Sequence, residues 1–314
     1  MELSSLYMMV GFLFAAWSVV ANDSIQTLGT FLASNDTVKW YWLFAATAGV
    51  MVITLGSGWY MNGGDMAFGR LDKIPLPITF TIWHAIAPVA LLILTRYGLP
   101  VSTTFLVLSV FASEVIMTKM ILKSALGYGV SFVAAFVIWK VISWVMDEHI
   151  PVNNEHKQYW RIGQWVATMF LWSQWLAHDM ANIAVYLPRT LDFWEVTLVL
   201  LVLSVFLAII FKQKGGKIQD IVLQKSGTRF IRSATIIDFV FAFMLWFFKE
   251  LNGIPMSTTW VFVGLLAGRE LAIHHLHNKD SHVGKIFPML IIDFLKVMAG
   301  LIFSVLLALA VVHL

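Results

Sequence analysis

Long apolar segments, separated by short polar stretches, run along the whole chain. A membrane-crossing helix needs about 20 mostly apolar residues, and ten segments are candidates. They cover roughly residues 5–33, 40–59, 77–95, 99–118, 125–146, 162–187, 194–211, 233–250, 256–272 and 286–312. The fourth and ninth begin at a proline-serine-threonine sequence, which favours half-helices or re-entrant hairpins because proline interrupts a helix. The first and sixth contain the polar pairs Asn22-Asp23 and His178-Asp179 and are expected to be broken or irregular there. The pattern predicts an all-α polytopic membrane protein with broken helices or re-entrant hairpins at the midplane.

Composition agrees with a protein that lies in a bilayer. The chain is 59% hydrophobic and 12% charged, whereas soluble domains carry about 25% charged residues. The absence of cysteine excludes disulfides and thiolate metal sites. The net charge of +3 does not indicate nucleic-acid binding, because the basic residues fall between the apolar segments. Residues 1–5 lack the basic start of a signal peptide, so we expect a retained first span in a multi-pass protein of the inner (plasma) membrane.

Two short motifs each occur twice. Gly-Leu-Pro-Val-Ser-Thr-Thr at 98–104 returns as Gly-Ile-Pro-Met-Ser-Thr-Thr at 253–259, and Ala-Asn-Asp at 21–23 returns as Ala-His-Asp at 177–179. The two offsets are 155 and 156 residues. Two motifs repeated at nearly the same spacing indicate a duplicated unit. In membrane proteins this pattern is typical of secondary transporters, whose site lies between two repeats.

A polar stretch divides the chain into the two copies. We expect a first transmembrane repeat at 1–146, a polar linker at 147–161 and a second repeat at 162–314, together forming one transport unit. Five crossings in each half, an odd number, make the second repeat run through the membrane in the opposite direction.

Loop charges support that inverted topology. Residues 212–232 carry six basic residues and one acidic residue, so this loop is expected to be cytoplasmic. The matching loop of the first half, 60–76, balances Arg70 and Lys73 with two aspartates and is expected on the outside.

The proline-serine-threonine motif can bind an anion. Ser102 and Ser257 suit the N-cap of a helix that begins in mid-membrane. The hydroxyls and free backbone N–H groups of such a start attract negative charge. The expected substrate-binding residues are Ser102, Thr103, Thr104, Ser257, Thr258 and Thr259.

The two aspartates point to cations. Ionisable groups at membrane depth are unfavourable unless partnered, and the nearest basic group to Asp23 or Asp179 in either motif is His178. Two aspartates and an oxyanion need compensating positive charge, which helix starts and co-bound cations can supply. Their oxygen ligands suit a hard cation and not a transition metal. The expected cation-binding residues are Asn22, Asp23, Asp179 and Asn182. The structural alternative is a helix kink at each proline and a helix cap at each aspartate.

At these motifs the chain resembles the inorganic phosphate transporter (PiT) family of sodium- or proton-coupled symporters. Its Gly-Ala-Asn-Asp-x-x-Asn signature corresponds to residues 21–26 and 177–182, and its Pro-Val-Ser-Thr-Thr-His signature to 100–104 and 255–259. Gly-Lys-Ile at 216–218 also looks like the family's sequence. The resemblance implies an inverted-repeat core, hydroxyls that hold the anion, Asn/Asp pairs that place sodium ions, and a homodimer.

The chain departs from the family pattern at or near the expected site. Val20 and Leu176 replace the glycines, Gln26 and His178 replace asparagines, and Phe105 and Trp260 replace the histidines. These changes leave open which anion and which cation the site binds. Inorganic phosphate with sodium is the main hypothesis, with protons as the second choice of cation and a sulfate permease as the alternative. No cofactor is expected. Outside transport, the alternative is an intramembrane enzyme that uses Asp23 or His178 on a phosphorylated lipid.

Further polar residues are expected to surround these groups. Gln26 and His178 lie next to them in the motifs. His84 and Asp238 occupy equivalent places in the two repeats and predict either a second layer or proton route, or hydrogen-bonded groups at a helix end. Histidines also gather at 274–282, where a solvated loop is favoured over a zinc site.

Overall fold

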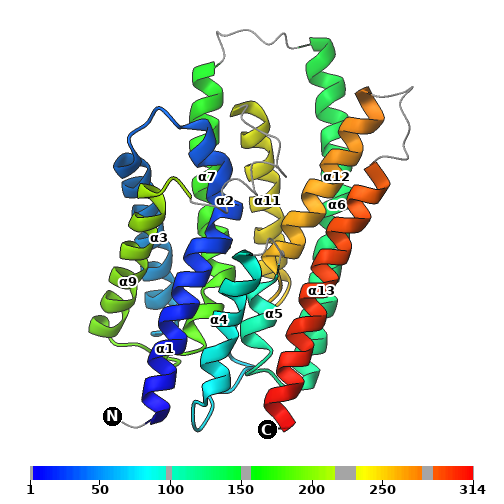
Figure 1. Ribbon diagram of the computed structural model, residues 1–314. Coiled ribbons are helices and arrows are strands. Elements are labelled where there is room, and N and C mark those ends of the chain that lie inside the picture. Colours follow the sequence, from blue (N-terminus) through cyan, green and yellow to red (C-terminus); the bar gives the residue numbers. More distant parts are fainter. Residues whose placement is uncertain (1–2, 97–100, 150–156, 216–230, 278–285, 314) are drawn as a thin grey trace.

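The computed structural model describes residues 3–96, 101–149, 157–215, 231–277 and 286–313, and every regular element in these ranges is a helix. The predicted all-α class is confirmed. In chain order (Figure 1) the helices are α1 (Leu3–Ser18), η1 (Val19–Asp23), α2 (Ser24–Ser34), α3 (Trp40–Met61), α4 (Ile82–Arg96), α5 (Thr103–Leu108), α6 (Glu114–His149), α7 (Lys157–Asp179), α8 (Ala181–Ala184), α9 (Phe193–Lys212), α11 (Ile231–Leu251), α12 (Thr258–His277) and α13 (Ile286–His313).

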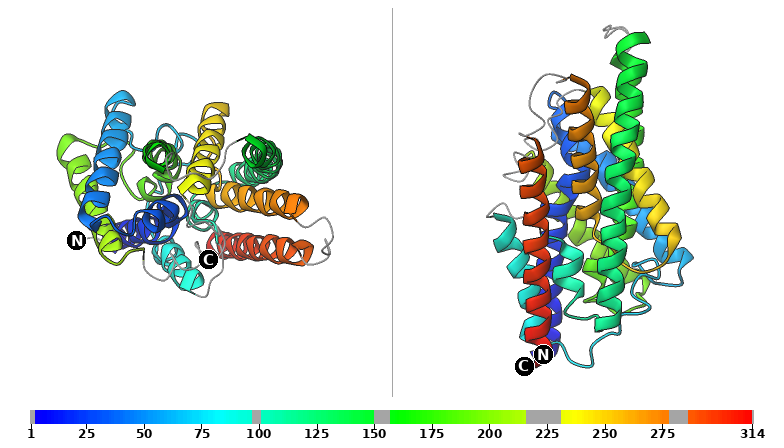
Figure 2. Two further views of the ribbon diagram at one scale, coloured as in Figure 1. Left: turned by 90° about the horizontal axis from the view of Figure 1, so that it is seen from above. Right: turned by 90° about the vertical axis from the view of Figure 1, so that its right-hand side faces the viewer.

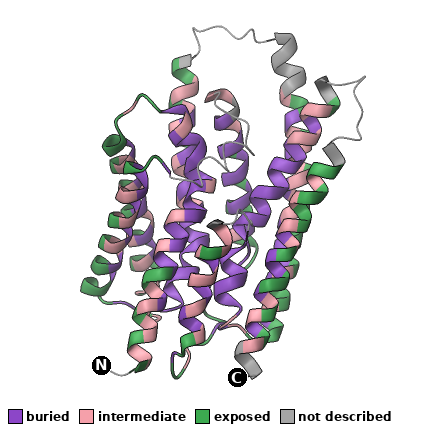
Figure 3. Ribbon diagram, in the orientation of Figure 1, coloured by how far each residue is buried: buried purple, intermediate pink, exposed green. Residues whose placement is uncertain are grey.

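Several helices are long and apolar enough to cross a bilayer. Within the described residues these spans are Leu3–Ser34, Trp40–Met61, Glu114–Ile142, Phe193–Lys212 and Pro288–Ala310. Apolar side chains on their outer faces are exposed, while buried residues gather where the helices meet (Figure 3). A surface of this kind is stable only against lipid, so the protein is a multi-pass membrane protein.

Two helix pairs reach only part of the way through the molecule. In Figure 1, α4 and α5 occupy the lower part, and α11 and α12 occupy the upper part. Both pairs turn back near the middle, at the two Ser-Thr-Thr sequences. The half-helices predicted at these sequences are therefore present, and they enter from opposite ends of the molecule.

The predicted spans 99–118 and 125–146 are wrong in one respect. α5 ends at Leu108, and α6 begins at Glu114 and continues without a break through 119–124, which the hydropathy pattern assigned to a loop. The pattern failed because Lys123 points into the protein. Its ammonium group donates to the Asn252 carbonyl and side-chain oxygens at 2.9 and 2.8 Å, so this charge does not require a solvated loop.

The helix contacts of the two halves match in pairs. α4 packs on α1 as α11 packs on α7, and α5 packs on α13 as α12 packs on α6. α3 and α9 also pack on each other. Seen from above, α12 and α13 lie side by side, and α1 begins at the same end of the molecule at which α13 ends (Figures 1 and 2).

Small residues bring α12 very close to α6. A Cβ atom on Gly264 would lie 2.6 Å from the Ser131 hydroxyl, and one on Gly268 would overlap the Phe132 carbonyl. Glycine at such positions lets helix backbones approach closely within a membrane. This contact holds the start of α12 in place at the centre of the molecule.

Candidate anion and cation site

The first aspartate lies where the N-terminal helix changes its winding. α1 and α2 are joined by η1, a π-helical turn that ends at Asp23. The Ser24 hydroxyl donates to the Val20 carbonyl at 2.5 Å and adds a side-chain bond to this widened turn. π-turns are rare and often occur at functional sites. The irregular helix predicted at Asn22 and Asp23 is confirmed.

The second aspartate lies at a matching break. α7 ends at Asp179, Met180 forms a turn, and the chain resumes as α8. The Ala184 N–H donates to the Met180 carbonyl at 2.8 Å, so helical hydrogen bonding returns directly after the aspartate. The irregularity predicted at His178 and Asp179 is also confirmed.

Each Ser-Thr-Thr sequence begins a helix whose first turn its serine caps. Ser102 Oγ accepts from the Phe105 N–H at 3.3 Å, and Ser257 Oγ accepts from the Trp260 N–H at 3.2 Å. This is the N-cap geometry that the sequence predicted. Because each serine oxygen acts here as an acceptor, its own O–H remains able to donate to a bound group.

The two helix starts meet each other. The rings of Phe105 and Trp260 lie edge to face with 5.5 Å between centroids. The Thr104 hydroxyl donates to the Met256 carbonyl at 3.3 Å, which joins the start of α5 to the segment before α12. Pro100, one of the two prolines expected at these starts, lies outside the described residues.

Within each half, a threonine donates to the aspartate of the same half. The Thr103 hydroxyl donates to Asp23 Oδ2, and the Thr258 hydroxyl donates to Asp179 Oδ2 at 2.7 Å. All four side chains are buried. The second motif of each repeat is thus bound to the first motif of that repeat.

A second set of hydrogen bonds crosses between the halves. Gln26 Nε2 donates to the Thr259 hydroxyl at 3.2 Å, and Asn182 Nδ2 approaches the Thr104 hydroxyl at 3.4 Å. Gln26 and Asn182 are equivalent in the repeat, as are Thr104 and Thr259. The two crossing bonds are therefore equivalent in the two halves, and Gln26 lies in the same hydrogen-bonded cluster as Thr259.

Several buried polar atoms of this cluster have no partner within the described residues. They are the amide nitrogen of Asn22 and the amide oxygens of Gln26 and Asn182. Buried polar groups are nearly always hydrogen-bonded in native proteins. The amide oxygens can ligate a cation, and the Asn22 nitrogen can donate to an anion.

A basic residue from a distant loop enters the Asp179 side of the site. Arg70 is 2% exposed, its Nε donates to the Ala177 carbonyl at 2.8 Å, and one terminal nitrogen lies 3.3 Å from His178 Nε2. Burial lowers the pKa of Arg70 to about 10, with Asp179 and Glu250 opposing the shift. The guanidinium is therefore charged at neutral pH.

Arg70 lies in the loop that the sequence predicted at 60–76, but its side chain is buried and not solvated; the outside location of this loop stays a prediction. Residues 62–81 connect α3 to α4, and part of this segment folds back among the helices. The Asp65 carboxylate accepts from the Ala67 and Gly69 N–H groups at 2.7 and 2.6 Å, which closes a turn directly before the arginine. The length of the segment was the available signal, because loops this long without helices or strands are usually functional or disordered.

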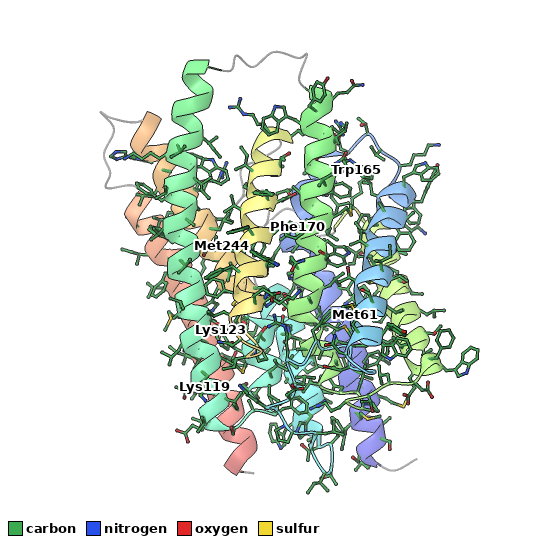
Figure 4. All side chains as sticks on the ribbon, turned by 180° about the vertical axis from the view of Figure 1, so that it is seen from behind. Met61, Lys119, Lys123, Trp165, Phe170 and Met244 are labelled. Atoms are coloured by element: carbon green, nitrogen blue, oxygen red, sulfur yellow. The ribbon has the colours of Figure 1, made fainter. Side chains whose placement is uncertain are left out.

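Lys123 holds the segment that leads into the second helix start. Besides its two bonds to Asn252, its ammonium donates to the Ile254 carbonyl at 2.8 Å. Figure 4 shows Lys123 on α6 beside the lower end of α11. The lysine fixes the chain just before Ser257, where irregular backbone needs bonding partners.

The two second-layer candidates lie apart from each other. His84 Nδ1 lies 2.9 Å from the Thr81 hydroxyl at the start of α4, so it belongs to a helix end. Asp238 on α11 instead accepts from Thr30 of α2 at 2.8 Å and from Thr168 of α7 at 2.5 Å. One side chain thus closes a turn, whereas the other connects three helices.

The described part of the histidine-rich segment, residues 274–277, is helical. His274, His275 and His277 fall in the last turns of α12, which corrects the predicted loop, and His282 lies outside the described residues. α12 continues to His277, beyond the end of the apolar segment predicted at 256–272. Among the described residues no group of histidines and acidic residues is placed to hold a metal ion.

Comparison with known proteins gives a fold. No protein-family model matches the sequence, and no curated protein matches it. A solved structure described as "The sodium-dependent phosphate transporter" matches 99% of this chain and 98% of its own chain, with a TM-score of 0.67 and 18% sequence identity. The chain therefore shares the all-α fold of that transporter, while the inverted repeats that the resemblance implies stay a prediction.

Proposed function

We propose that this protein carries inorganic phosphate across the inner (plasma) membrane together with a cation, sodium in the first place. One observation carries the proposal: two Ser-Thr-Thr helix starts from opposite ends of the molecule meet between the buried Asp23 and Asp179. The fold shared with a protein described as a sodium-dependent phosphate transporter supports it.

The anion is held by hydroxyl and N–H donors. Ser102 and Ser257 cap their helices with oxygen lone pairs and keep their O–H groups for the ligand. The first N–H groups of α12 have no carbonyl partner within the helix and favour negative charge. The Asn22 amide nitrogen adds a buried donor. A small tetrahedral oxyanion, with an acceptor on each corner, matches this set.

The charges of the site require a co-bound cation. Two carboxylates and the Arg70 guanidinium leave one negative charge, which one sodium ion neutralises, while the helix start of α12 and the hydroxyl and amide donors face the charge of the phosphate. Unbalanced charges in a dry site are strongly unfavourable. The cation is bound by Asp23, Asp179, Asn182 and Asn22, and the unpartnered amide oxygens of Gln26 and Asn182 match a sodium ion.

His178 is poorly placed to carry a coupling proton. Its Nε2 lies 2.7 Å from the Leu245 carbonyl, so that nitrogen donates and the other ring nitrogen is the free one. A positive charge on the ring would face the Arg70 guanidinium at 3.3 Å. Like charges this close repel strongly in a buried site, which favours sodium over protons.

Transport follows from movement of two related halves. We propose that 1–146 and 162–314 are inverted repeats that move against each other and expose the site alternately. The matched helix contacts and the exchanging hydrogen bonds support this division. The homodimer implied by the family resemblance stays a prediction.

Uptake into liposomes tests the proposal. Purified protein is reconstituted, and entry of radiolabelled phosphate is measured with a sodium gradient, with a proton gradient and with neither. We expect sodium-driven accumulation that unlabelled phosphate abolishes and sulfate leaves largely intact; the Asp23→Asn variant is the matched control.

Two results would contradict it. If sulfate is accumulated instead of phosphate, the protein is a sulfate permease. If neither anion enters under either gradient while phosphate is released from a phosphorylated lipid, the enzyme alternative holds.

A further inference from the structure

The two halves of the site hold equivalent groups around each aspartate. Asp23 accepts from Thr103, and Asp179 accepts from Thr258. Both carboxylates are almost fully buried, at 2% and 1% exposure, and they are close enough to repel each other. On these features alone, both halves would need the same amount of positive charge.

The halves differ at the residue before each aspartate. Asn22, with its unpartnered amide nitrogen, precedes Asp23, whereas His178 precedes Asp179. The Ala177 carbonyl accepts from Arg70 Nε at 2.8 Å, and a terminal nitrogen of Arg70 lies 3.3 Å from His178 Nε2. Among the described residues, no arginine or lysine takes the corresponding place beside Asn22.

Arg70 acts on Asp179 through space. Of the described ion pairs, none includes Arg70, and its NH1 nitrogen is buried without a hydrogen-bond partner. Asp179 follows directly after the two residues that Arg70 contacts, and its negative charge opposes the lowering of the Arg70 pKa by burial. A buried guanidinium with a free N–H group and a nearby carboxylate is a fixed counter-charge, since arginine keeps its proton at physiological pH.

We infer that Arg70 supplies the fixed counter-charge of Asp179, so that the site takes up one transported cation, whose charge balances that of Asp23. The inference rests on the proposed function and adds to it the number of coupled ions. With Arg70 in place, a second sodium ion beside Asp179 would meet a positive charge already present. The Asp23 half has no such charge and needs a mobile one.

Counting bound sodium tests the inference without any variant. Equilibrium binding of radioactive sodium to purified protein at saturating phosphate is expected to give about one sodium per chain, and sodium-dependent uptake a Hill coefficient of about 1. Two bound sodium ions per chain would overturn the inference and leave the proposed function intact. Failure of all phosphate and sulfate uptake would contradict the proposed function, while the sodium count still decides the inference.

Neutralising Arg70 gives the second test. Arg70→Gln keeps hydrogen-bonding capacity and removes the charge, so it is expected to bind a further sodium ion and to raise the half-saturating sodium concentration for uptake about tenfold. Arg70→Lys is expected to restore the wild-type count. Arg189→Gln is the matched control, because this loop arginine donates mainly to backbone carbonyls, including that of Ile74 at 2.9 Å. An Arg70→Gln protein with the wild-type sodium count and dependence would contradict the inference; if it does not fold, the wild-type count decides.

Discussion

The Asp23 half and the Asp179 half use the same hydrogen bonds and different charges. Each aspartate accepts from the first threonine of its own half, and each second threonine is met by an amide from the opposite half. Among the described residues, only the Asp179 half receives a buried guanidinium, from the loop that follows α3. The difference teaches that two copies of a motif can keep the same hydrogen bonds while the charge beside each carboxylate differs.

Replacing the aspartates one at a time is expected to give the largest effects. Asp23→Asn is expected to reduce sodium-driven phosphate uptake by about 100-fold or more, because the Asp23 half has no other charge to attract the cation. Its thermal stability should be unchanged or higher, since a buried charge that repels Asp179 is gone.

Asp179→Asn is expected to be inactive and less stable as well. It leaves one oxygen for two donors, Thr258 and Asn182, and leaves Arg70 without its counter-charge, so the free energy of unfolding is expected to fall by about 2–4 kcal/mol. Thermal unfolding of both variants in the same detergent measures the contrast. Equal stabilities would show that the halves are electrostatically alike.

Removing both capping serines is the next largest change. Ser102→Ala combined with Ser257→Ala is expected to weaken phosphate binding by about 100-fold, because each lost hydroxyl removes a donor and an N-cap. The two single variants should weaken phosphate binding by similar factors, since both serines cap their helices in the same way. Calorimetric titration with phosphate checks this, and near-normal affinity of the double variant would count heavily against an anion site here.

The two halves also differ in how tightly the helix after each Ser-Thr-Thr sequence is packed. Gly264→Ala is expected to destabilise the protein by about 1–3 kcal/mol, because its new methyl group would meet Ser131 at 2.6 Å. The equivalent residue in the first half, Ser109, makes only a long contact of 3.5 Å to the Ser304 carbonyl, so Ser109→Ala should have little effect. Gly49→Ala, with no atom within 4 Å of the added carbon, is the control for helix propensity.

The crossing hydrogen bonds are expected to give the smallest effects. Thr259→Val removes the partner of Gln26, and Thr104→Val removes the partner of Asn182 together with the bond to the Met256 carbonyl. The free energy of unfolding of each variant should fall by about 1 kcal/mol, with the larger loss for Thr104→Val. Uptake kinetics and thermal unfolding measure both. A larger loss at Thr259 would show that the crossing bonds are not equivalent.

The sequence predicted those parts of the candidate site that depend on neighbouring residues within each repeated motif. A duplicated proline-serine-threonine motif indicated helix starts, and Ser102 and Ser257 do cap helices. A duplicated aspartate inside an apolar segment indicated irregular helices, and both are present. Local chemistry and repetition were sufficient for these features.

The parts that depend on the path of the chain through space were not predictable from the sequence alone. Arg70 and Lys123 read as loop charges, because a hydropathy profile cannot show that a basic side chain is surrounded by carbonyl groups inside the protein. The same holds for Asp238, whose two threonine partners come from helices far apart in sequence. These contacts are set by tertiary packing and leave no periodic trace.

The edge-to-face contact of Phe105 and Trp260 makes one indole a natural reporter on the movement of the halves. If they rock apart, the indole loses its aromatic neighbour and its surroundings become more polar, which shifts its fluorescence to longer wavelength. Comparing the emission of the native chain with that of a Trp260→Phe variant isolates this signal from the other tryptophans. Substrate-dependent opening could then be followed in real time without any attached dye.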